Sequence, residues 1–94
     1  METIVIDNLN WFDLSTKLES LTLTNGKTYE IQAQENQIRF FKGAAVPTEA
    51  TAGFIVNPIT QSVRFDFATG DVIALRVNNF LNMANINHIT VAEV

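Results

Sequence analysis

The stretch Gln61-Ser62-Val63-Arg64-Phe65-Asp66-Phe67 decides the fold. Apolar and charged side chains alternate along it, with Arg64 and Asp66 set between apolar neighbours. Successive side chains of a β-strand point to opposite faces, so this alternation is typical of a strand with one face in the core and the other in water. We predict such a strand here, and its core-facing side chains are Val63, Phe65 and Phe67.

The same alternation recurs in stretches rich in valine, isoleucine, threonine and aromatic residues, which suit a pleated, half-covered surface. These stretches are Leu21–Thr24, Thr28–Gln34, Gln37–Phe41 and His88–Val94. Short strands at regular spacing, without a convincing amphipathic helix, indicate an all-β fold. We expect an antiparallel β-sandwich, jelly-roll-like, or a small barrel.

The dipeptide Asn25-Gly26 lies between two alternating runs. Type I′ turns favour this dipeptide because both of their central residues need positive φ. We therefore predict a hairpin that pairs Leu21–Thr24 with Thr28–Gln32.

Three further connections follow from turn-forming residues. Ala68–Asp71 is predicted, by the same logic, to be a tight turn between Val63–Phe67 and Val72–Val77. Glu35-Asn36 is predicted to be another turn. Gly43–Gly53 is a longer run of small residues, and its proline excludes a central strand. We expect this run to cross between the two sheets.

Two regions depart from the alternation. Asp7–Leu18 mixes aromatic and acidic residues and is compatible with an arm, a short helical turn or an edge strand. In Asn78–Asn87 the apolar residues at 80, 81, 83 and 84 have helical spacing, which predicts one short helix near 79–86. We expect a single β-sandwich domain over 1–94, with 1–18 as an N-terminal arm or edge strand.

Composition excludes several classes of protein. The chain has 94 residues, 47% of them hydrophobic, which is enough for one core. It has no cysteine, so packing and hydrogen bonds must hold a fold that forms readily in a reducing cytoplasm. The net charge is −4 and the six basic residues are scattered, which argues against nucleic-acid binding. No apolar run is long enough to span a bilayer, so we expect no membrane partner.

No catalytic or metal-binding motif is convincing. Gly26-Lys27-Thr28 resembles the end of a phosphate-binding loop, but the glycine required five positions earlier is Leu21. His88 is the sole histidine, and a small esterase or metal-dependent enzyme would depend on it. Nominal partners for a Ser-His-Asp site are Ser15, Ser20, Ser62, Asp7, Asp13, Asp66 and Asp71. Asp66 and Asp71 could also hold calcium, although their spacing matches no known calcium loop. We predict no catalytic residue, no metal and no cofactor.

The motifs occur in a characteristic order, as Leu21–Gln32, Ile38–Phe41, Val46–Thr48, Gly53–Pro58, Val63–Phe67, Gly70–Arg76 and Ile89–Val94. This order, over about three quarters of the chain, resembles that of small β-sandwich virion proteins of tailed bacteriophages and prophages. The sequence differs from the family pattern at Ile59, where family-like sequences tend to place glycine after the proline.

The resemblance implies a non-enzymatic structural role as a capsid-decorating, head-fibre or tail-associated subunit. Such a protein is made and folded in the bacterial host cytoplasm and located in the virion. Its partners are phage capsid or tail proteins and further copies of itself, with a trimer favoured.

Apolar residues outside the regular strands are the candidates for these contacts, because buried aromatic anchors carry much of the energy of an interface. They are Trp11, Phe12, Leu14, Phe80, Leu81, Met83 and Ile86. The alternative is that they cap the open ends of the sandwich. A second functional reading is a carbohydrate-binding module, for example in a receptor-binding fibre, with Trp11, Phe12 and Tyr29 as stacking platforms.

Overall fold

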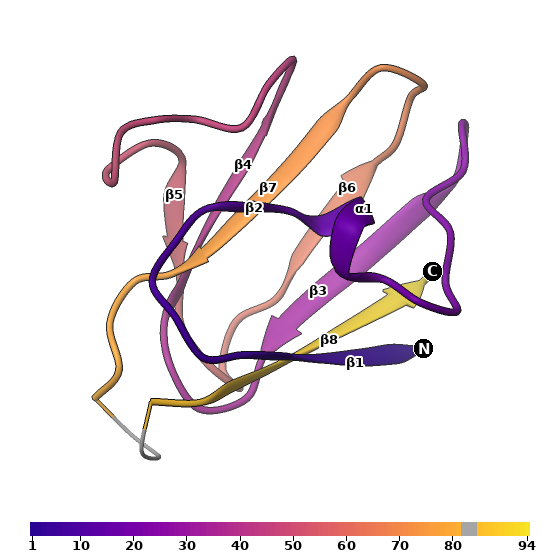
Figure 1. Ribbon diagram of the computed structural model, residues 1–94. Coiled ribbons are helices and arrows are strands. Elements are labelled where there is room, and N and C mark those ends of the chain that lie inside the picture. The colour runs from indigo at the N-terminus through magenta and orange to yellow at the C-terminus, as the bar shows by residue number, and fades with distance from the viewer. Residues whose placement is uncertain (82–84) are drawn as a thin grey trace.

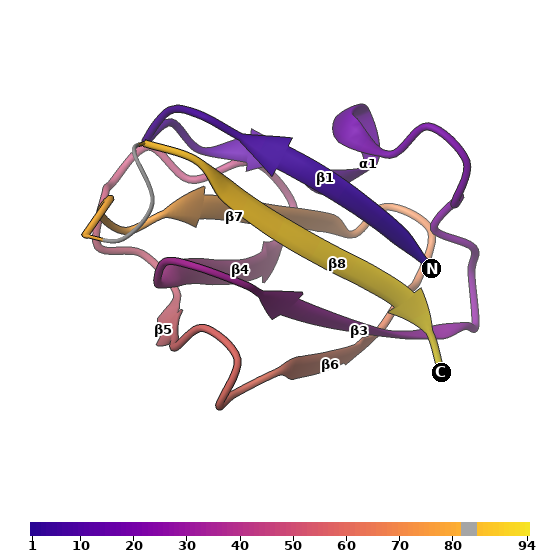
Figure 2. The ribbon, with the colours of Figure 1, turned by 90° about the horizontal axis from the view of Figure 1, so that it is seen from below.

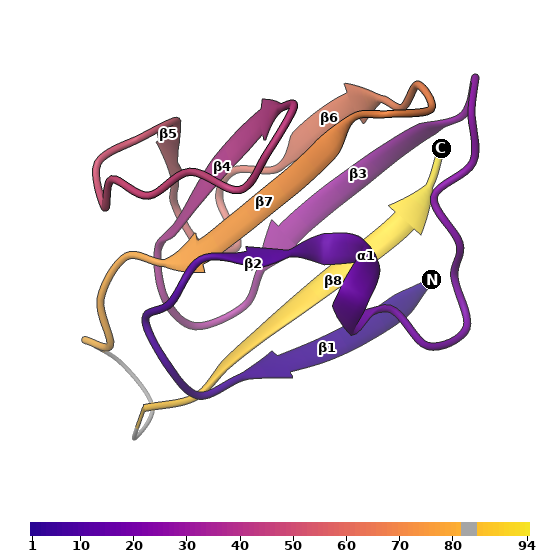
Figure 3. The ribbon, with the colours of Figure 1, turned by 45° about the horizontal axis from the view of Figure 1, so that its top comes forward.

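The computed structural model describes residues 1–81 and 85–94, which form two four-stranded antiparallel sheets. Sheet A has the order β1 (Glu2–Ile6), β8 (Asn87–Glu93), β3 (Thr28–Ala33), β6 (Val63–Asp66). Sheet B has the order β2 (Phe12–Asp13), β7 (Val72–Val77), β4 (Ile38–Gly43), β5 (Phe54–Val56). The sheets pack face to face, with β1 and β2 along one side of the sandwich and β5 and β6 along the other (Figures 1 and 3). The predicted all-β sandwich is confirmed.

Alternating side chains build the core, as the sequence pattern predicts. On β3 the side chains of Tyr29, Ile31 and Ala33 are fully buried, whereas the residues between them are partly exposed. On β6, Phe65 is buried and its charged neighbours face water. Figure 2 shows β1, β8, β3 and β6 in succession across sheet A, whose inner face contributes half of this core.

A row of aromatic rings crosses the core from β5 to β3. The centroid of the Phe54 ring lies 5.4 Å from that of Phe40, which lies 5.6 Å from that of Phe65. The ring of Phe65 in turn stacks on Tyr29, with centroids 5.7 Å apart. Since Phe40 and Phe54 belong to sheet B and the other two rings to sheet A, the row ties the two layers together.

Two buried asparagines fix the bend at residues 34–36, where the chain passes from sheet A to sheet B. The Asn87 Nδ2 donates to the Asn36 carbonyl at 3.0 Å, and its Oδ1 accepts from the Asn36 N–H at 3.1 Å. The Asn36 Nδ2 donates to the Ile86 carbonyl at 3.1 Å. Side-chain amides here take the place of strand partners, so backbone groups at the bend are hydrogen-bonded although they lie outside a β-ladder.

The predicted hairpin at Asn25-Gly26 is wrong in its strand partner. The turn exists, because the Lys27 N–H donates to the Thr24 carbonyl at 3.1 Å. Gly26 has φ +82° whereas Asn25 does not enter positive φ, as in a type II turn. Residues 21–24 form no strand, and β3 pairs with β6 and β8 instead.

Side chains, not a neighbouring strand, satisfy the backbone of residues 19–24. The Tyr29 hydroxyl donates to the Thr22 carbonyl at 3.0 Å and accepts from the Thr24 N–H at 2.7 Å. The leucines at 21 and 23 pack against the core, as their alternation predicts. The alternating pattern therefore predicts correctly which of these residues pack on the core, although they do not form a strand.

The other connections follow a different route between the sheets from the one the sequence predicts. The turn at Ala68–Asp71 is present, with an Asp71 N–H to Ala68 carbonyl bond of 2.9 Å, but it leads from β6 in sheet A to β7 in sheet B. The run Gly43–Gly53 does not cross between sheets, because it joins the paired strands β4 and β5. Gly53, at φ +70°, makes this return possible: a Cβ there would lie 2.0 Å from the Phe40 carbonyl oxygen.

The N-terminal residues belong to the sandwich edges. β1 pairs with β8, β2 pairs with β7, and α1 (Leu14–Lys17) follows β2 with Asp13 as its N-cap. The helix predicted near 79–86 falls partly on residues 82–84, outside the described residues, and the described residues on either side of them are not helical. Within residues 1–81 and 85–94, no helix has the length and apolar character needed to cross a membrane.

Candidate functional site: an open edge of the sandwich

The residues predicted as contacts do not form one surface. Leu14 is fully buried, and Phe12 and Phe80 pack against the core. Trp11 is half-buried, and its Nε1 donates to the Glu49 carbonyl at 2.9 Å. Two residues of the predicted set are exposed, Leu81 and Ile86, whereas Met83 lies outside the described residues. For Leu14, Phe12 and Phe80, this arrangement matches the alternative that they cap the sandwich.

The side of the sandwich formed by β1 and β2 is fastened by polar contacts as well as by Leu14, although Val5 is exposed there and a groove of about 320 Å³ lies along β1. The Glu2 carboxylate accepts the backbone N–H groups of Glu19, Ser20 and Leu21 at 2.7, 3.0 and 2.8 Å. These hydrogen bonds, led by that of Leu21, hold the pKa of Glu2 below its ordinary value. The charged carboxylate thus fastens β1 to the segment that follows α1.

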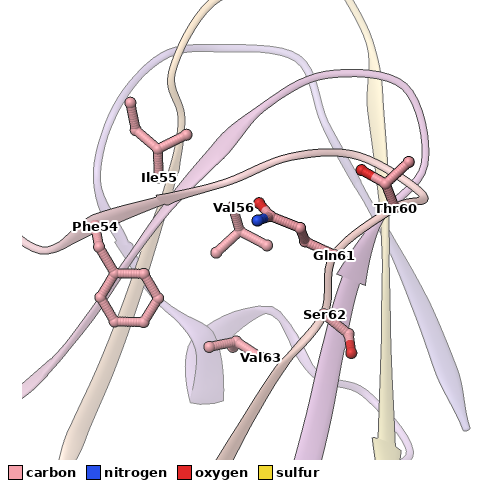
Figure 4. A pocket seen from close by; sticks show the side chains of 7 residues that line it. All are labelled: Phe54, Ile55, Val56, Thr60, Gln61, Ser62 and Val63. Atoms are coloured by element: carbon pink, nitrogen blue, oxygen red, sulfur yellow. The ribbon is translucent and has the colours of Figure 1, made fainter.

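The opposite side presents apolar side chains to water. β5 and β6 are edge strands of different sheets, and a groove of about 410 Å³ runs between them. It is lined by Phe54, Ile55, Val56, Thr60, Gln61, Ser62 and Val63, and we call it the β5–β6 groove. The side chains of Phe54 and Ile55 leave β5 in opposite directions (Figure 4). They are 50% and 42% exposed, so two adjacent large apolar residues of this edge strand face water.

Ile59 adds a strained apolar residue beside the groove. It has φ +63°, and the Thr60 N–H donates to the Pro58 carbonyl at 2.6 Å, so Ile59 is the central residue of a γ-turn. A β-branched residue at positive φ is a genuine outlier. The turn is held in place because the Ile59 N–H donates to the Ala33 carbonyl and its carbonyl accepts from Gln32 Nε2. The side chain itself is 66% exposed.

Two arginines fasten the loop 44–53 over the outer face of sheet B, next to β5. Arg39 and Arg76 are direct cross-strand partners. The Arg39 Nη1 donates to the carbonyls of Thr51 and Ala52, and the Arg76 Nη1 donates to that of Ala50. Backbone carbonyls therefore offset the repulsion between the two like charges.

Sequence reasoning missed the exposed residues of this edge. It did not single out Phe54 or Ile55 as contact residues, and it treated Ile59 only as a departure from a family pattern. A usable signal existed, because the apolar run Phe54–Val56 is bounded closely by Gly53 and Pro58. Proline cannot donate to a ladder, so such a short run favours an edge strand.

The structure does not bring a serine hydroxyl to His88. The His88 Nδ1 lies 2.6 Å from the Glu35 Oε1, and the same oxygen accepts a hydrogen bond from the His88 backbone N–H. The three serine hydroxyls bond to carboxylates elsewhere: Ser15 to Asp13, Ser20 to Glu2 and Ser62 to Glu30. A nucleophile–base pair requires a direct hydrogen bond or one bridging water, and these hydroxyls are oriented by other groups.

A lysine occupies the space between the two aspartates considered for calcium. The Lys42 Nζ donates to the Asp66 carbonyl at 2.8 Å and lies 3.6 Å from the Asp71 Oδ2. The Asp66 Oδ1 accepts from the Thr28 hydroxyl at 2.6 Å. Among the described residues, no group of three or more potential His, Cys, Asp or Glu ligands is close enough to hold a metal ion.

Comparison of the chain with protein-family models, with curated proteins and with solved structures finds no match.

Proposed function

We propose that this chain is a non-enzymatic structural subunit of a tailed-bacteriophage virion, in the capsid decoration or the tail, and that it works through protein–protein contacts. The observation that carries the contact role is the exposed apolar edge of β5, where Phe54 and Ile55 are half exposed and line the β5–β6 groove. Exposed apolar residues that cluster beside a groove mark interaction surfaces more often than isolated ones do.

The architecture supports this role. The fold has no disulfide and uses two compact sheets whose outward residues on sheet A are mostly polar. A structural subunit needs a stable scaffold and a contact surface, and its function resides in that surface. The order of sequence motifs that resembles small virion proteins supplies the virion assignment.

The carbohydrate-binding alternative has less support. Tyr29 is fully buried with its hydroxyl engaged, so its ring cannot stack on a sugar. Trp11 is half-buried and its Nε1 is bound to the Glu49 carbonyl. Sugar platforms require an exposed ring face.

Purified particles test the proposal directly. Particles would be isolated by density gradient from the phage or induced prophage that encodes the chain, and labelled with an antibody against the chain. We expect labelling on the head or the tail at regular positions. A chain that stays in the lysate and never co-purifies with particles would refute the virion role.

A further inference from the structure

We infer that the β5 edge pairs with the same edge of a second copy of this chain, antiparallel and about a two-fold axis at Ile55. This inference rests on the proposed role as a contact subunit and names the partner of the β5–β6 groove. Four features of the edge support it: the direction of its free backbone groups, its side-chain pattern, its lack of charge and the strain at Ile59.

The free backbone groups of β5 are those of Ile55. The Gln37 carbonyl accepts from the Asn78 N–H, so at this position β4 faces β7. Because backbone groups alternate along a strand, Ile38 and Phe40 face β5, and their register partners Val56 and Phe54 face β4 in return. The N–H and C=O of Ile55 therefore point away from sheet B, which is the direction a further strand would take.

A two-fold axis at Ile55 makes this edge self-complementary. Two antiparallel copies of Phe54–Val56 centred there place Ile55 opposite Ile55, and each exchanges its N–H and C=O with the other. Phe54 then lies opposite Val56 of the second copy on the inner face. Both half-exposed side chains of β5 become covered, and sheet B continues across the junction.

Charge favours a second copy over another partner. All residues that line the β5–β6 groove are uncharged, whereas the chain carries a net charge of −4. Interface centres are depleted of charge, and a neutral patch lets two like-charged copies meet. The nearest basic residue in register is Arg39, beside Ile55. Its copy would lie three strand spacings away, about 14 Å, which exceeds the screening length of about 8 Å at physiological salt.

The strained γ-turn that follows β5 holds an exposed apolar group, and the proposed pairing would bring this group to the rim of the contact. Ile59 is two-thirds exposed in one copy, where it gains little from burial, and yet it holds an unfavourable backbone conformation. Strain of this kind persists where the surrounding structure over-determines it, and it concentrates at functional positions. Coverage by a second copy gives the side chain the apolar environment that it lacks in the monomer.

Sedimentation velocity and light scattering over a concentration series test the pairing. We expect a reversible dimer with a dissociation constant on the order of 10 μM, at the weak end for specific interfaces. Ile55→Lys places two ammonium groups at the axis and should weaken association at least about tenfold. Val5→Lys is the matched control, because Val5 is an exposed β-branched residue on edge strand β1, and it should leave association unchanged.

Ile59→Gly separates association from folding. It should weaken the dimer several-fold while the thermal midpoint stays the same or rises, because glycine relieves the positive φ. Amide exchange provides a second measurement: the Ile55 N–H should exchange more slowly as the dimer fraction rises.

Several outcomes would overturn the pairing. They are a monomer at about 500 μM, well above the expected dissociation constant; a trimer of wild-type chains; or equal loss of association in Ile55→Lys and Val5→Lys. A monomer that is nevertheless found in purified particles refutes the pairing alone. A dimer that is never found in particles refutes the virion role and leaves the pairing intact.

Discussion

The two long sides of the sandwich are bordered by the same kind of edge strand but are finished differently. Along β1 and β2 the chain buries Leu14 and fastens β1 through the carboxylate of Glu2. Along β5 and β6 it leaves Phe54 and Ile55 half exposed and holds Ile59 in a strained turn. The difference teaches that charged and polar groups border one edge, where Val5 is exposed beside Glu2 and Lys17, whereas the other edge exposes adjacent large apolar residues beside an uncharged groove. The β5–β6 side is therefore the one to examine for a partner.

The largest expected effect compares one apolar residue from each side. Leu14→Ala should lower the free energy of unfolding by about 2–5 kcal/mol, because it leaves a cavity in a fully buried site. Phe54→Ala should lower it by only about 1–2 kcal/mol, because half of that side chain is already in water. Urea denaturation followed by tryptophan fluorescence gives both values. Equal losses would show that the β5–β6 side is as tightly packed as the β1–β2 side.

Between the two sides, on the inner strand β3, Tyr29→Phe should lower the free energy of unfolding by about 1–2 kcal/mol. The substitution keeps the ring stacked on Phe65 but removes the hydroxyl that bridges the Thr22 carbonyl and the Thr24 N–H. Hydrogen exchange should become faster at the Thr24 amide and remain unchanged in β7. Unchanged exchange at Thr24 would mean that the segment 19–24 is held by its leucines alone.

On the open side, Ile59→Gly should raise the free energy of unfolding by about 0.5–1 kcal/mol. Relief of the positive φ contributes about 1–2 kcal/mol, and the greater freedom of glycine in the unfolded chain offsets part of it. Ile59→Val is the matched control, since valine keeps the β-branch and the strain, and it should give no gain. Denaturant midpoints at low protein concentration, where monomer dominates, provide the comparison.

The smallest expected effect is on the pH and salt dependence of stability, and it compares the carboxylates of Glu2 and Glu30. The folded-state pKa of Glu2 is lowered by backbone N–H donors and that of Glu30 by the Arg64 guanidinium. Each charged carboxylate therefore contributes stability above its ordinary pKa of 4.5, and this contribution is lost as pH falls through the lowered value. Glu2→Gln and Glu30→Gln should each differ from the wild type at pH 7 and converge with it in acid.

Salt separates these two variants. The Arg64–Glu30 pair is an exposed ion pair, so about 1 M salt should reduce the effect of Glu30→Gln. The three backbone donors to Glu2 are fixed by the chain itself, and the effect of Glu2→Gln should persist. If both effects disappear together in salt, the contribution of Glu2 is mainly long-range charge.

Much of the fold could be predicted from the sequence because burial leaves a local pattern. The alternation at Val63–Phe67 predicts Phe65 in the core and Arg64 and Asp66 in water, as observed. The same logic places Leu21 and Leu23 against the core. Strand pairing could not be predicted in the same way. Backbone groups of residues 19–24 are hydrogen-bonded by the side chains of Glu2 and Tyr29, which lie elsewhere in the sequence.

Turn residues predict where the chain reverses but not which sheet receives the next strand. Gly70 enables a tight turn whether β6 and β7 pair or lie in opposite layers. The return at Gly53 depends on a close approach to the Phe40 carbonyl, which is a tertiary contact. The candidate site was harder still to predict from the sequence, because the exposure of Phe54 depends on the tertiary arrangement of all the segments around it.

The pairing of β1 with β8 has a consequence for synthesis in the cell. Among the described strands, β8 is the one that pairs with β1 in sheet A, so β1 finds its partner only after Asn87–Glu93 has emerged from the ribosome, whereas β3 is able to pair with β6 earlier. The backbone groups of Glu2–Ile6 therefore stay without their strand partner while residues 7–86 are translated. Such distant pairings slow folding and leave nascent strands open to aggregation. A chaperone that shields Glu2–Ile6 until Asn87–Glu93 is available should therefore raise the yield of native protein.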